Sequence, residues 1–86
     1  MDEFIRVIEV YNLNRNGSRD LRLSRVGIKW YVYTFDFETG NVQFGNSTAQ
    51  HTPAGLASLF IPMSEAEANS CFANAKASHQ EYKNGR

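Results

Sequence analysis

The chain has 86 residues, of which 42% are hydrophobic and 21% are charged, and its formal net charge is zero. This length leaves room for a single domain, residues 1–86, and the composition is typical of an ordinary globular protein. Neutrality argues against a protein dedicated to coating nucleic acid. No apolar run approaches the ~20 residues that cross a bilayer, so we expect no membrane partner.

The start of the chain and its cysteine content indicate a compartment. The first ten residues, MDEFIRVIEV, begin with acids and lack the basic segment followed by an apolar run that marks a secretory signal. The single cysteine, Cys71, has no partner for a disulfide within the chain, which fits a reducing environment. We therefore expect a cytoplasmic protein.

The first half of the chain predicts strands. Residues 3–11, EFIRVIEVY, are rich in β-branched and aromatic side chains and indicate a first strand. Residues 12–20 are dense in Asn, Gly, Ser and Asp, which favour a loop. Apolar residues then alternate through residues 21–37, with Gly27 at the place where a bulge or break would fall.

A hairpin and two helices follow. Gly40 suits a tight turn before a returning strand at residues 42–46. Thr52 and Pro53 have the positions of an N-cap and a first helical residue, which predicts a short helix over residues 53–60. Ser64 and Glu67 form a capping-box pattern ahead of a helix over residues 65–83. Its apolar stripe is Ala68, Cys71, Phe72, Ala75, His79 and Tyr82.

Strands first and helices last predict an α+β fold. We expect a small antiparallel sheet of three strands, or four if residues 21–37 break at Gly27, with the C-terminal helix packed on one face. One helix cannot cover both faces of a sheet. The strand within residues 27–37 nevertheless has large side chains on both faces, since Trp30 and Val32 alternate with a second set of rings. The second set is Tyr31, Tyr33 and Phe35.

Two explanations of this second aromatic face stay open. The short helix at residues 53–60 can fold over it and make it core. Alternatively the face remains open and contacts a partner, because tyrosine rings tolerate water and add buried area on binding. That partner can be another protein, a second copy of the chain in a homodimer, or unpaired bases that stack on the rings.

A basic run precedes the aromatic strand. Between residues 15 and 29 there are five cations and one acid, Asp20, so the local balance is +4. These cations can neutralise phosphates, steer an acidic protein towards the chain, or face solvent as ordinary surface charge. The predicted partner-binding residues are Tyr31, Tyr33, Phe35, Arg15, Arg19, Arg22, Arg25 and Lys29.

Residues that could support catalysis are sparse. Cys71 and His79 lie eight positions apart on one predicted helix, which separates them by about 12 Å and prevents a nucleophile–base pair. One cysteine and two histidines, His51 and His79, do not supply a closed zinc site, and no glycine-rich phosphate loop is present. We therefore expect no catalytic residues, no metal and no cofactor.

The remaining class is binding. The sequence predicts a small non-catalytic interaction protein that blocks or adapts a larger macromolecule. One concrete form is an inhibitor of a nucleic-acid-processing defence complex, of the kind that mobile elements encode. The alternatives are a single-stranded nucleic-acid-binding domain that uses the aromatic face and the arginine-rich loop, and a small enzyme that depends on Cys71 or His79.

Overall fold

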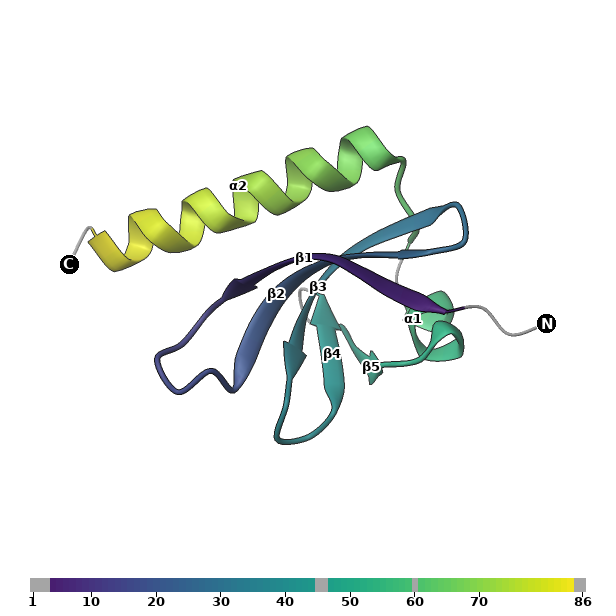
Figure 1. Ribbon diagram of the computed structural model, residues 1–86, viewed down its shortest axis with the longest axis horizontal. Coiled ribbons are helices and arrows are strands. Elements are labelled where there is room, and N and C mark those ends of the chain that lie inside the picture. The colour runs from purple at the N-terminus through teal and green to yellow at the C-terminus, as the bar shows by residue number, and fades with distance from the viewer. Residues whose placement is uncertain (1–3, 45–46, 60, 85–86) are drawn as a thin grey trace.

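The fold is a five-stranded antiparallel sheet with one helix on each face (Figure 1). The computed structural model describes residues 4–44, 47–59 and 61–84. The strand order follows the chain order, so each strand pairs with the next. The strands are β1 (Ile5–Asn12), β2 (Arg19–Val26), β3 (Lys29–Asp36), β4 (Asn41–Phe44) and β5 (Ser47–Gln50). The helices are α1 (Pro53–Leu59) and α2 (Glu65–Asn84).

The α+β class is confirmed, and the predicted count of three to four strands is too low. The alternating run at residues 21–37 is two strands, because Val26 pairs with Lys29 and the chain turns within Gly27 and Ile28. Gly27 has a φ of 60°, as the first central residue of a tight type II′ hairpin turn requires. The predicted ends at residue 3, at residues 45–46 and at residue 60 lie outside the described residues.

Strand β5 is the second strand beyond the expectation. It pairs with β4 from Asn41 opposite Gln50 to Phe44 opposite Ser47. Its sequence, STAQ, carries only one apolar residue, Ala49, which packs at the rim of the core. A strand with so little apolar alternation gives no period-2 signal.

Helix α2 packs on one face of the sheet, as predicted, and this is the face that carries Trp30 and Val32. Ala68 and Phe72 are buried there, and Cys71 and Ala75 are packed against the same cluster. The capping box forms as expected. The Glu67 amide donates to Ser64 Oγ at 3.2 Å, and the Ser64 amide donates to Glu67 Oε1 at 3.0 Å.

Helix α1 covers the opposite face. Its Leu56 is fully buried in a cluster with Tyr31, Tyr33, Val26 and Val42. Thr52 caps the helix, since its Oγ1 accepts the Gly55 N–H at 3.0 Å. Gly55 lets the helix lie close to β5, because a Cβ at this position would stand 2.3 Å from the carbonyl oxygen of Gln50. The short helix therefore completes a second small core.

Among the helices of the described residues, none is both long enough and apolar enough to cross a membrane. The longest, α2, is 20 residues long and carries charged and polar side chains along much of its length.

Candidate functional site

Of the two explanations of the aromatic face, the structure supports cover by the short helix, because the face is largely closed. Tyr31 and Tyr33 have exposed fractions of 3% and 1%, and Phe35 is half-buried. The expectation that the two tyrosine rings are available to a partner is therefore wrong for the monomer. The physical reason is α1, whose Leu56 packs into the same cluster as both rings. The proposed stacking of bases on Tyr31 and Tyr33 fails for the same reason.

Part of that sheet face remains uncovered beyond α1. Val7 and Val10 of β1 are 38% and 48% exposed, and Phe37, just after β3, is 51% exposed. Val7 lies opposite Ser24 and Val10 opposite Arg22, which in turn lies opposite Tyr33, so these residues share the face that carries α1. We name this surface the Arg22 face and define it as Val7, Val10, Arg22, Phe35 and Phe37.

Arg22 is the centre of the Arg22 face. Its guanidinium carbon lies 4.2 Å from the centroid of the Phe35 ring and 5.4 Å from that of Phe37. The two rings contact each other edge to face, with 5.0 Å between their centroids. Guanidinium–ring packing of this kind stabilises by about 0.5–2 kcal/mol and holds the side chain in place. Arg22 Nε is buried and has no hydrogen-bond partner among the described residues.

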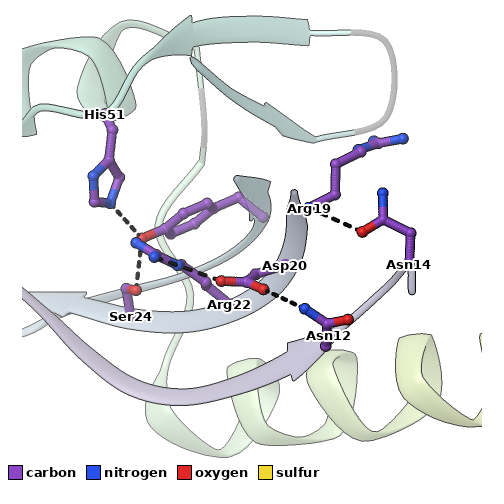
Figure 2. A network of polar contacts seen from close by, with 8 residues as sticks. Asn12, Asn14, Arg19, Asp20, Arg22, Ser24 and His51 are labelled. Atoms are coloured by element: carbon purple, nitrogen blue, oxygen red, sulfur yellow. Dashed lines mark hydrogen bonds and ion pairs between the residues drawn. The ribbon is translucent and has the colours of Figure 1, made fainter. Parts of the chain in front are cut away.

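Arg22 also faces a buried acid. Asp20 is 5% exposed, and its Oδ2 lies 3.6 Å from an Arg22 terminal nitrogen. Asn12, opposite Asp20 on β1, donates from Nδ2 to Asp20 Oδ1 at 3.2 Å. Figure 2 shows this chain of polar contacts along β2. The position of the arginine is therefore fixed from two sides, by an acid and by two rings.

A second group of polar contacts lies deeper on the same face. The Tyr33 hydroxyl lies 2.7 Å from Ser24 Oγ and 2.8 Å from His51 Nε2. Burial raises the pKa of Tyr33, although its hydrogen bond to Ser24 and the charge of Arg22 oppose the change. Burial, together with the nearby charge of Arg22, lowers the pKa of His51. Ser24 has no exposed surface, so a substrate cannot reach its hydroxyl. The three residues together link the sheet to the segment that leads into α1.

The predicted basic run does not form one patch. Arg19 and Arg25 point to the face covered by α2, since they lie opposite Asp36 and Trp30. Arg22 and Lys29 point to the other face, opposite Tyr33 and Val26. The exposed Arg15 sits in the loop before β2. The alternation of a β-strand therefore divides the cations between two surfaces.

Cys71 and His79 make separate contacts on α2. Cys71 is half-buried against the α2 core, and His79 Nδ1 lies 3.1 Å from the hydroxyl of Tyr11 on β1. Over residues 4–44, 47–59 and 61–84, no three His, Cys, Asp or Glu side chains come together as a metal site would require.

Strand β1 adds an edge to this site. It forms one border of the sheet and, among the described strands, pairs only with β2. Its register shifts between Val7 and Glu9, where Ile8 is inserted and is 44% exposed. An edge strand carries backbone groups that no neighbouring strand uses, which makes it a template for a further polypeptide.

The sequence did not reveal the roles of Asp20, Ser24 and His51. A signal for the first two exists, because Asp20, Arg22 and Ser24 alternate on one face of a strand whose other face carries Leu21 and Leu23. Three polar residues on the inner face of a strand indicate a buried network. His51 lies 18 positions from Tyr33, and nothing local in the chain predicts that contact.

Comparison with known proteins gives no relative. No protein-family model matches the chain, no curated protein matches it, and no solved structure matches it.

Proposed function

We propose that the chain is a non-catalytic interaction protein that binds a larger protein through the Arg22 face and the adjoining edge of β1. The observation that carries the proposal is the exposed apolar surface around a fixed arginine. Val7, Val10 and Phe37 stand in water around Arg22, whose guanidinium is already held by Phe35 and Asp20.

The composition of this surface suits a protein interface. Arginine and aromatic residues are enriched at the centres of interfaces, where a few residues supply most of the binding free energy. A side chain that is held before binding loses less entropy on association. The contacts of Arg22 with Phe35 and Asp20 provide that order in the free monomer.

The edge of β1 indicates that the partner is a polypeptide. Unpaired backbone N–H and C=O groups along an edge are matched by another extended backbone, which adds as a further strand. The inserted Ile8 interrupts the register of β1 with β2, so the edge of β1 is regular only over short segments on either side of it. A short strand of the partner, supported by apolar contacts on Val7 and Val10, fits an edge that is open but interrupted.

The loop before β2 borders the same surface. The Phe37 amide donates to the carbonyl oxygen of Ser18 at 2.9 Å, which places the end of this loop beside the Arg22 face. Arg15 in the loop is exposed. A cation at the rim of an interface raises the association rate with an acidic partner more than it raises the affinity. An inhibitor of a nucleic-acid-processing complex remains one concrete form of this function.

The test is affinity capture from the native host with a matched pair of variants. The tagged chain, a Val10→Lys variant and an Ile61→Lys control are incubated with lysate, and the captured proteins are identified. Ile61 is 85% exposed and lies outside the Arg22 face. The proposal predicts a protein that is captured by the wild type and the Ile61→Lys control and is lost with Val10→Lys. Equal capture by all three chains contradicts it.

Self-association is measured with the same chains. A second copy of the chain can also use an edge strand. The molar mass in solution at two concentrations distinguishes this outcome, because a dimer formed through β1 dissociates on dilution and is abolished by Val10→Lys. A stable dimer that survives Val10→Lys would place the homodimer contact elsewhere.

A further inference from the structure

The opposite face of the sheet carries two arginines directly across from each other. Arg6 of β1 pairs in register with Arg25 of β2, and Arg25 pairs with Trp30 of β3. The three side chains therefore form one row across three strands, on the face that α2 covers further along. Arg6 is exposed, and Arg25 and Trp30 are partly exposed. We name these three residues the Arg6–Arg25–Trp30 row.

Like charges directly opposite each other on neighbouring strands are unfavourable. Neither Arg6 nor Arg25 has an ion pair within the part of the chain that the structure describes. The acid nearest to Arg6 on the same face of β1, Glu9, is already paired with Lys76 of α2 at 3.1 Å. Glu67, near the start of α2, accepts the amide of Ser64. The repulsion in the row is therefore not balanced by a described acid.

An aromatic ring completes the row. The guanidinium carbon of Arg25 lies 5.9 Å from the centroid of the Trp30 ring. The backbone of Trp30 pairs with that of Met63, at 3.0 and 3.3 Å, which holds this end of β3 against the segment leading to α2.

We propose that the Arg6–Arg25–Trp30 row binds single-stranded nucleic acid. Arg6 and Arg25 contact successive phosphates, and Trp30 offers an aromatic surface to a base. A guanidinium group can donate two parallel hydrogen bonds to the oxygens of one phosphate. Aromatic rings beside cations are typical of surfaces that bind single strands. A bound phosphate also removes the repulsion between the two arginines. This site is separate from the Arg22 face and does not depend on the proposed protein partner.

The probe is a fluorescent 15-nucleotide single strand, compared with the duplex of the same sequence and with poly-glutamate. For a single strand, each phosphate that a cation neutralises adds about −0.7 to the slope of log K against log salt, so two cations give a slope of about −1.4. Raising salt fourfold, from about 50 to about 200 mM, should then weaken binding about sevenfold. Trp30 is the only tryptophan in the chain, and its emission should be quenched by the single strand.

Two double variants separate this site from the basic loop. Arg6→Gln/Arg25→Gln removes both cations of the row, so binding should weaken at low salt, any residual binding should lose its dependence on salt, and the quenching of Trp30 should disappear. The matched control, Arg15→Gln/Arg19→Gln, removes the same charge and should bind like the wild type. The first variant should also be at least as stable as the wild type, because a repulsion is removed.

Several results would overturn the proposal. These are the absence of single-strand binding at 50 mM salt, duplex or poly-glutamate binding as tight as single-strand binding, and loss of binding in the Arg15/Arg19 variant but not in the Arg6/Arg25 variant. None of them bears on capture through Val10, so the two proposals fail independently.

Discussion

The Tyr33 hydroxyl lies 2.8 Å from Nε2 of His51, and this contact links the central strand of the sheet to the segment that leads into α1. The same hydroxyl lies 2.7 Å from Ser24 Oγ. One buried oxygen thus connects β2, β3 and the start of the covering helix. The position of α1 decides which aromatic surface is available to a partner, so this contact bears on function as well as on stability.

Removing the hydroxyl should destabilise the fold. Tyr33→Phe leaves both Ser24 and His51 without this partner in a buried site, and an unsatisfied buried polar group costs about 1–3 kcal/mol. Urea denaturation measures the change in the free energy of unfolding. Tyr11→Phe is the matched control, because the Tyr11 hydroxyl contacts His79 in a half-buried position. If Tyr11→Phe lowers the free energy of unfolding as much as Tyr33→Phe does, the buried contacts of Tyr33 do not stabilise the fold more than a half-buried contact.

The stability should depend on pH through His51. Burial and the charge of Arg22 lower the pKa of His51 below its ordinary value of 6.5. The unfolded chain therefore takes up the proton at a higher pH than the folded chain. The stability that depends on a neutral His51 is fully present above about pH 6.5, and it is lost as the pH falls through the pKa of His51 in the folded state. Thermal unfolding between pH 7.5 and 5 should show a flatter profile for His51→Gln, and identical profiles would exclude this assignment.

A methyl group at Gly55 should displace α1. The added Cβ would stand 2.3 Å from the carbonyl oxygen of Gln50, so the helix must move away from β5. Overpacking of this kind costs about 1–3 kcal/mol. The comparison variant is Ala54→Gly, at an exposed helical position, which should cost only about 0.5–1 kcal/mol through helix propensity. Binding of a hydrophobic dye should rise for Gly55→Ala alone, as Tyr31 and Tyr33 become accessible.

Arg22 and Asp20 should behave as a coupled pair. Arg22→Met leaves the buried Asp20 carboxylate with the hydrogen bond from Asn12, and breaking a buried ion pair costs about 3–5 kcal/mol. Adding Asp20→Asn should recover more than half of the loss, because no uncompensated charge remains. The four chains of the double-mutant cycle are compared by urea denaturation. Additive costs would mean that the 3.6 Å contact contributes nothing to the fold.

Much of the fold follows from local patterns. The capping box of Ser64 and Glu67 fixed the start of α2, and Thr52 with Pro53 predicted α1. The 17 residues from 21 to 37 alternate in the same way whether they form one strand or a hairpin, so the pattern alone does not decide whether the chain turns at Gly27. Strand β5 gives no local signal, because its side chains are mostly polar and it is held by pairing with β4.

The candidate site was harder to predict than the fold. Tyr31, Tyr33 and Phe35 were identified on the correct face, but their exposure depends on where Leu56 packs, and that is a tertiary contact. The basic run was visible in the sequence, but the division of its cations between two faces depends on the strand register. The cross-strand pair of Arg6 and Arg25 is created by pairing alone, across 19 positions of the chain.

The most direct test of the central claim is hydrogen exchange of the chain alone and in complex with the captured protein. The account predicts that amides in β1 and around Phe37 exchange more slowly in the complex, while those of α1 are unchanged. The contrary result is protection of α1 with β1 unaffected. It would mean that the partner binds over the covering helix, and that the Arg22 face is not the interface.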